Sequence, residues 1–279
     1  MWTTGYEEVG TVDFGLSCEI DEDITATQTS ILVRDVDGAD SFEAGELAYI
    51  GDEIVRLDAY DSGTLTLTVG RGCLDTPPRT HRRGAALIAW DEWFGADPTE
   101  RVDGETINVK IQPKSGSGVL PLGSANELEV TLAQRAIKPY APGDMQINGE
   151  SYEDNTYDGT LTITWAHRDR TQQTSTAVED HEDGDIGPET GVLYRLRVLD
   201  EDGNPVPADT IDDISGTTED ITPSVTGRIT LLLDAKNTDG LYSFLPATHT
   251  FLYTGGNVRL TEPGGVRATE DGGVRLTED

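Results

Sequence analysis

Apolar and polar residues alternate through much of the chain, with the two-residue period of strands that bury one face. The clearest runs are Leu161-Thr-Ile-Thr-Trp165 and Tyr194-Arg-Leu-Arg-Val198, in which threonines or arginines separate the apolar residues. Further β-prone runs cover residues 229–235 and 248–253. The pattern predicts an all-β protein.

A second group of short β-prone runs lies in residues 24–95. Turn signals separate several of them, at Asp37-Gly38, Gly51-Asp52 and Ser62-Gly63. This spacing predicts a small β-barrel or sandwich module. The expected strands are 29–34, 47–50, 53–57, 64–69 and 85–90.

The other segments read as attachments to these two domains. Residues 1–23 are expected to form an arm with one strand, and residues 96–138 a bridging β-hairpin with strands at 106–111 and 127–132. Residues 255–279 repeat Gly-Gly, Val-Arg and Thr-Glu, and a single copy is too short to bury its own apolar residues. This tail is either a stem stacked between subunits or an acidic extension in solvent.

Residues 139–254 resemble a fibronectin type III domain. The likeness rests on the order of a tryptophan strand, a tyrosine strand, a strand ending in Ala-x-Asn-x-x-Gly-x-x-Ser and a final strand. The resemblance implies a β-sandwich whose core holds a buried tryptophan. The expected core residues are Trp165, Tyr194, Leu196, Leu231 and Leu233.

A second resemblance covers Gly45–Arg56 and Leu65–Gly84, and its most specific stretch begins at Arg71. These residues look like a small β-module of tail-tip and hub proteins in tailed bacteriophages and gene transfer agents. In that module a strand with Gly-x-Glu-x-Val/Ile precedes Arg-Gly-x-Leu-Asp-Thr-x-Pro-x-x-His-x-x-Gly. The residues that we assign to this structural motif here are Arg71, Gly72, Asp75, Thr76, Pro77, His81 and Gly84.

Those residue types indicate a structural loop. Arg71 and Asp75 are expected to pair across a tight turn, and His81 to cap the loop. His81 is followed by Arg82 and Arg83, and it lacks the serine elbow or metal partner that catalysis would need. We therefore expect no enzymatic activity.

The excess of acidic over basic residues excludes some classes of binding partner. With 52 acidic and 20 basic residues the chain carries a net charge of −32, which argues against binding nucleic acid or anionic membranes through a basic surface. Such a surface is tolerable in concentrated salt, where the Debye length falls to about 3 Å. The composition resembles that of proteins from salt-loving archaea and their viruses, against the alternative of an ordinary acidic protein.

Candidate chemistry is sparse. Cys18 and Cys73 are expected to be small core residues, because two cysteines without CxxC spacing make neither a disulfide framework nor a zinc site. No cofactor is expected; Asp180, Asp183 and Asp185 are weak candidates for Ca²⁺, although their spacing does not match the calcium-binding loop Asp-x-Asp-x-Asp-Gly. A solvated acidic surface is the alternative. No apolar run reaches membrane-spanning length, and residues 1–8 lack the pattern of a signal peptide.

Together the two resemblances imply a structural protein of the virion. We expect a tail-tip, hub or baseplate component, made in the host cytoplasm, whose partners are other tail proteins and copies of itself, as a homotrimer. Loops of the sandwich and the repeated tail would then contact a host-surface glycan or protein. The alternatives are a carbohydrate-binding surface or fibre module and an envelope-degrading hydrolase, which would need two carboxylates in one cleft.

Overall fold

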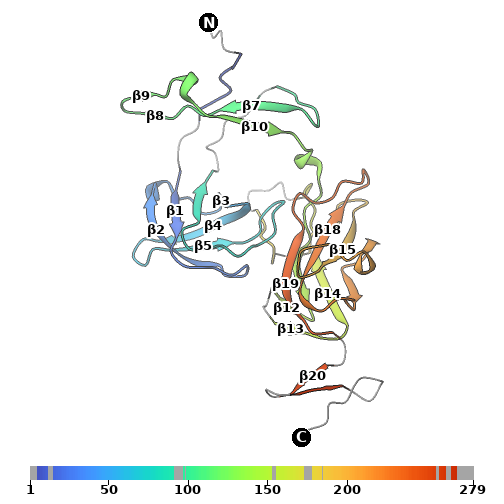
Figure 1. Cartoon of the computed structure of the whole chain (residues 1–279). Helices are drawn as coiled ribbons and strands as arrows, with labels where there is room; N and C mark the ends of the chain where they lie inside the picture. Colours follow the sequence, from blue (N-terminus) through green and yellow to red (C-terminus); the bar gives the residue numbers. More distant parts are fainter. Residues whose placement is uncertain are drawn as a thin grey trace. The chain divides into compact units, whose positions relative to one another are not determined.

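The computed structural model describes residues 5–11, 15–90, 97, 99–152, 155–172, 178–183, 185–255, 258–261 and 265–268. Within these residues the regular secondary structure consists of β-strands and short 3-10 helices, so the all-β expectation is confirmed (Figure 1). Its compact units are residues 1–12 with 95–138, and residues 13–94 with 139–279. No helix in the described ranges is long and apolar enough to cross a bilayer.

The amino-terminal module is a closed six-stranded barrel with the strand order β1-β2-β5-β4-β3-β6, in which β6 pairs with β1. A 3-10 helix, η1 (Ala39–Ser41), lies between β2 and β3. The barrel includes β1, which the sequence analysis places in the arm before residue 24. The strands are β1 (Ser17–Ile20), β2 (Ser30–Asp37), β3 (Leu47–Ile50), β4 (Glu53–Asp61), β5 (Thr66–Gly70) and β6 (Ala86–Ala89).

Alternate residues of these strands fill the barrel. Ile31 and Val33 of β2 and Leu67 and Val69 of β5 are buried together, while the residues between them are more exposed. Cys18 of β1 lies in the same core. Burial raises the pKa of its thiol to about 12, so the side chain acts as a small apolar residue.

Residues 139–254 contain two β-sheets that share one core. The four-stranded sheet has the order β12-β11-β14-β17 and the five-stranded sheet the order β13-β19-β18-β15-β16. A 3-10 helix, η4 (Pro207–Asp209), precedes β16. The strands are β11 (Gly143–Ile147), β12 (Glu150–Ser151), β13 (Thr156–Tyr157), β14 (Leu161–Ala166), β15 (Leu193–Leu199), β16 (Ile211–Ile214), β17 (Thr218–Ile221), β18 (Gly227–Lys236) and β19 (Ala247–Tyr253).

The core between the sheets contains every residue that the sequence analysis assigns to it: Trp165, Tyr194, Leu196, Leu231 and Leu233. The indole of Trp165 on β14 meets the ring of Tyr194 on β15 edge to face, with centroids 5.4 Å apart. Such a pair joins the two sheets directly. On the outer face of the five-stranded sheet, Arg195 and Arg197 both bind Oδ2 of Asp234, at 2.9 and 2.7 Å.

The other compact unit, residues 1–12 with 95–138, is called the bridging unit below. Its centre is a two-stranded antiparallel ribbon of β7 (Thr106–Lys110) and β10 (Glu127–Thr131). Between these strands lie β8 (Lys114–Ser115), β9 (Gly118–Val119) and η2 (Leu122–Ser124), and η3 (Arg135–Ile137) follows. The ribbon has the hairpin pairing expected from the alternating pattern.

The repeated tail begins with a short antiparallel pair, β20 (Val258–Thr261) and β21 (Gly265–Ala268). These strands come from the first two copies of the repeat. The third copy lies outside the described residues.

Candidate functional site

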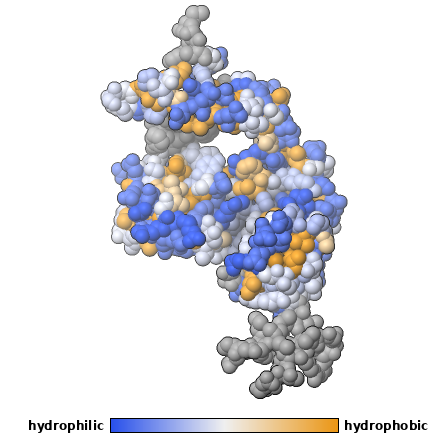
Figure 2. All heavy atoms as spheres, viewed as in Figure 1, coloured by the Kyte–Doolittle hydropathy of each residue, from blue (hydrophilic) through white to orange (hydrophobic). Residues whose placement is uncertain are grey.

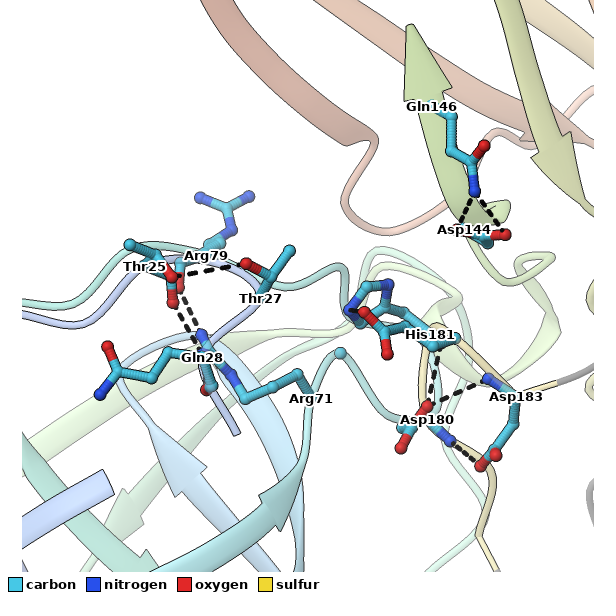
Figure 3. Close-up of polar contacts among 12 residues, drawn as sticks. Thr25, Thr27, Gln28, Arg71, Arg79, Asp144, Gln146, Asp180, His181 and Asp183 are labelled. Carbon is cyan, nitrogen blue, oxygen red and sulfur yellow. Dashed lines mark hydrogen bonds and ion pairs between the residues drawn. The ribbon is translucent and has the colours of Figure 1, made fainter. Parts of the chain in front are cut away.

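The most specific sequence motif forms a buried charge cluster at one end of the barrel. Arg71 follows β5 directly and is only 1 % exposed. Its guanidinium is fully used: Nε and Nη2 donate to the Glu53 carboxylate at 2.8 and 2.9 Å, and the remaining hydrogens go to backbone carbonyls. Those carbonyls belong to Thr25, Gln28 and Arg79 (Figure 3). Arg71 therefore holds three separate segments on one planar group.

Glu53, the first residue of β4, is fully buried and accepts from five donors. In addition to the two from Arg71, the backbone amides of Gly72 and Arg79 donate at 2.9 and 3.0 Å, and Nε2 of His81 lies at 2.7 Å. Burial alone would raise the pKa of Glu53, but the hydrogen bonds from Arg71 and His81 outweigh it and hold the pKa below its usual value. The carboxylate is thus ionised, with its acceptor sites taken.

The expected pairing of Arg71 with Asp75 is wrong, because all five guanidinium hydrogens go to Glu53 and backbone carbonyls. His81 likewise binds the carboxylate of Glu53. Its backbone also pairs with Ile24, and these bonds attach the end of the motif to the barrel.

The other motif residues shape the loop 71–84, called the motif loop below. Gly72 has a φ of +59°, and a Cβ there would lie 2.7 Å from Pro78, so only glycine fits. Thr76 is buried; its hydroxyl accepts from the amide of Ile54 and donates to the carbonyl of Cys73. Asp75 and Pro77 are buried too, and the amide of Gly84 donates to Ile20.

A loop of the sandwich packs against this end of the barrel. Residues 178–183, called the docked loop, belong to the long connection between β14 and β15. Arg56 of β4 donates to the Val178 carbonyl and lies 3.4 and 3.1 Å from carboxylate oxygens of Asp180 and Asp183. The side chain of Val178 packs against the barrel cluster around Cys73. The loop is therefore held by both charge and apolar contact.

Backbone hydrogen bonds continue the contact. The amide of His181 donates to the carbonyl of Arg71 at 2.9 Å, and the carbonyl of His181 accepts from the amide of Asp144 in β11 at 2.7 Å. From the sandwich side, Nη1 of Arg168 donates to the carbonyl of Gly72 at 2.9 Å. The motif loop thus takes part in both the barrel and the junction with the sandwich.

Two titratable groups are buried at this junction. His181 is 3 % exposed, and burial lowers its pKa to about 4, so the imidazole is neutral near pH 7. It meets the ring of Tyr152 edge to face, with centroids 5.8 Å apart. Arg168 is 6 % exposed, and burial lowers its pKa as well. The junction therefore buries the neutral imidazole of His181 and the charged guanidinium of Arg168 away from water.

The three aspartates considered for Ca²⁺ are not gathered around one point. Asp180 and Asp183 bind Arg56 and also accept amides within their own loop. Asp185 accepts the amide of His167 at 2.6 Å. Across the described ranges, no group of three or more His, Cys, Asp and Glu side chains is placed to hold a metal ion. The docked loop also differs from the expected solvated surface, because it lies against the barrel.

The arrangement of Arg71, Glu53 and the motif loop holds segments of the chain together. Every polar group of the Arg71–Glu53 pair is used in the fold, and the thiol of Cys73, whose pKa burial raises to about 12, is a poor nucleophile. Two residues central to the site escaped sequence reasoning: Glu53, the carboxylate of the cluster, and Arg56, the anchor of the docked loop. Glu53 did leave a signal, as the acidic residue of the Gly-x-Glu-x-Val/Ile pattern before an apolar run.

Comparisons with known proteins add little to this picture. No family model matches the chain, and no curated protein does. Among solved structures, the crystal structure of the extracellular domain of a one-component system from B. thetaiotaomicron aligns with 84 % of this chain at 10 % identity and a TM-score of 0.23. The chain spans 36 % of that protein's length.

Proposed function

We propose that the chain is a non-enzymatic structural protein of a viral tail, acting at the distal tip, hub or baseplate in assembly and host attachment. The supporting observation is the motif loop, the stretch that resembles the tail-protein module. Its buried residues are used to hold strands and loops in place: Arg71 and Glu53 bind each other, and Thr76 links β4 to Cys73. Residues whose polar groups are all used to hold segments together suit a role in assembly.

The junction supports the same proposal. The motif loop also binds the docked loop, through the bond from His181 to Arg71, and it accepts from Arg168. A barrel and a sandwich fixed to each other by the buried Arg168 and by the ion pairs of Arg56 suit a component that must transmit position between neighbouring subunits. The net charge of −32 supports an origin in a virus of salt-loving archaea.

The test is the location of the chain in particles. Antibodies raised against the purified chain would be used for gold labelling of particles released by the producing cells and kept in concentrated salt. We expect gold at the free end of the tail, and a band of this mass in purified particles. Absence from particles, or label on the cell surface alone, would overturn the proposal.

A second candidate, carbohydrate binding, is favoured by a polar hollow on the sandwich. A cavity of about 410 Å³ is lined by Asn148, Glu150, Asn155, Thr156, Tyr157 and Asp158. Amides, carboxylates and a tyrosine are side chains that bind sugar hydroxyls. Within the cavity, Asn155 and Tyr157 both donate to Oε2 of Glu150, at 2.5 and 3.1 Å.

Titration with polysaccharide isolated from the surface of the producing cells tests this candidate. Saturable binding that Glu150→Ala weakens, and that Glu201→Ala in a distant turn leaves unchanged, would support it. Equal binding by both variants, or no binding by the unaltered chain, would rule out this cavity as the sugar site.

A further inference from the structure

The β7–β10 ribbon of the bridging unit has one polar and one apolar face. Its register places Val130 opposite Ile107 and Leu128 opposite Val109, and opposed residues of an antiparallel pair share a face. These four residues are called the ribbon face below. Lys110 opposes Glu127 on the other face.

The arm is placed on the polar side. The Tyr6 hydroxyl donates to Glu127, and the ammonium of Lys110 lies 5.1 Å from the centre of the Tyr6 ring. On the ribbon face, Leu128 is 50 % exposed and Val130 is 42 % exposed. Ile107 and Val109 opposite them are half-buried, so none of the four residues of the ribbon face is buried within the chain as described.

Apolar exposure is concentrated in this part of the chain. Of the 13 large hydrophobic residues that are exposed among those described, seven lie in residues 95–138. Figure 2 shows apolar residues (orange) reaching the surface there among polar ones. A two-stranded ribbon is marginally stable by itself, and a third strand or a packed layer is what normally completes it. The seven are Val102, Ile111, Val119, Leu120, Leu128, Val130 and Ile137.

The same residues are almost neutral in an otherwise very acidic chain. Residues 95–138 contain six acidic and five basic side chains, a net charge of −1, whereas the whole chain carries −32. Removing −1 from −32 leaves −31 for all other residues. Three of the four lysines, Lys110, Lys114 and Lys138, belong to this neutral stretch. Repulsion between two copies of the chain is therefore weakest where this stretch is the point of contact.

We propose that the ribbon face is a self-association surface, on which the ribbon face of a second copy packs. A basic partner would be drawn to the residues that carry −31, so neutrality together with exposed leucine and valine favours a partner that is itself acidic. In this contact Leu128 and Val130 of each copy pack against the ribbon face of the other, so that each ribbon supplies the apolar layer that covers its partner. This inference rests on the proposed assembly role, and names the surface through which copies of the chain meet.

Sedimentation velocity of the full chain tests it, at about 0.2 M and about 3 M KCl, because salt screens the remaining negative charge. We expect reversible association that tightens with salt. Leu128→Asp should raise the dissociation constant by about tenfold or more, since it places a charge in the apolar contact. Asn108→Asp is the matched control: it adds the same charge to the polar face of the same ribbon and should change the constant by less than about threefold.

Folding is checked separately. The near-ultraviolet spectrum, which reports the packing of Trp165 and Tyr194 in the sandwich, should be the same in all three proteins. As a second readout, pyrene attached at Leu128→Cys should give excimer emission at high salt, and pyrene at Asp202→Cys in a sandwich turn should not. Cys18 and Cys73 are buried and should not label in the folded chain.

A chain that stays monomeric at every concentration and salt would overturn the inference, as would equal effects of Leu128→Asp and Asn108→Asp. Location in particles is measured independently. If the chain is found at the tail end but its association is unchanged by Leu128→Asp, the proposed tail function is retained and the ribbon face is rejected as the self-association surface. If association depends on the ribbon face but the chain is absent from particles, only the proposed tail function is rejected.

Discussion

The junction between barrel and sandwich and the ribbon of the bridging unit use charged and apolar residues in opposite ways. At the junction the charges are buried and bound: Arg71 is 1 % exposed, Glu53 is fully buried, and each binds the other. In the bridging unit the ion pairs of Arg101 with Asp97 and Glu105 lie at the surface, while leucine and valine are exposed. The first region is complete within one chain, and the second has an apolar face that a partner would complete.

The comparison separates stability from association. Buried charge pairs are costly to break, because removing one partner leaves the other without compensation in a dry site. Exposed ion pairs contribute at most about 1 kcal/mol. Substitutions at the junction should therefore change the free energy of unfolding, and substitutions in the ribbon should change the tendency of copies to associate.

The largest effect is expected for Arg71→Met. It leaves the Glu53 carboxylate buried without its cation, and should lower the free energy of unfolding by about 3–5 kcal/mol. Denaturation by guanidinium thiocyanate or urea at fixed high salt measures it. In the bridging unit, Glu127→Gln is the control, and should change stability by less than about 0.5 kcal/mol. If Arg71→Met and Glu127→Gln lowered the free energy of unfolding equally, the contrast between the junction and the ribbon would be wrong.

A smaller effect should appear as a pH dependence at His181. Its pKa is about 4 in the folded chain and 6.5 for the free side chain, so the unfolded chain takes up the proton first as pH falls. Stability is therefore full above about pH 6.5 and decreases toward pH 4, by about 3 kcal/mol in all. The lowered pKa of Glu53 acts in a separate window, because its contribution is lost below the usual carboxyl range.

The check is the difference between the unaltered chain and His181→Gln, measured by urea denaturation from pH 7 to pH 4. The unaltered chain should lose stability faster than the variant over this range. Parallel curves would show that the imidazole is not buried in its neutral form. Association through the ribbon face should be insensitive to this substitution.

The smallest effect is expected for Arg56→Ala, which removes the ion pairs and the carbonyl contact that hold the docked loop. Amide hydrogen exchange at His181 and Asp144 should become about tenfold faster, since both amides are bonded through His181 of the docked loop, which Arg56 secures. The control is Arg82→Ala, which removes an exposed pair with Asp23 and should leave both rates unchanged. Unchanged exchange in Arg56→Ala would show that apolar packing of Val178 alone holds the loop.

The alternation of apolar and polar residues along the chain was sufficient to predict much of the fold. Trp165, Tyr194, Leu196, Leu231 and Leu233 share the core that their spacing assigns to them, because successive residues of a strand point to opposite faces. The turn signals Gly51-Asp52 and Ser62-Gly63 likewise lie at the hairpins that join β3 to β4 and β4 to β5. The predicted run 53–57 was shorter than β4, which continues to Asp61.

Contacts between residues far apart in the sequence could not be predicted in the same way. Asp75 stands four residues from Arg71 and was the natural partner by spacing, yet Glu53 reaches the guanidinium because β4 and β5 are neighbours in the barrel. The docked loop shows the same limit: Asp180 and Asp183 read as a solvated or calcium-binding cluster, but they meet Arg56 from another domain. A carboxylate does not encode its partner locally, since any nearby cation would satisfy it.

The amino-acid sequence by itself determined the all-β class, the residues inside the sandwich and the contrast between an acidic chain and its neutral stretch, because burial period and charge are local properties. Tertiary structure alone decided that β1 closes the barrel, that Arg71 binds Glu53, and that the docked loop lies on the motif loop. These outcomes depend on which strands become neighbours, and that is fixed only when the whole sheet closes.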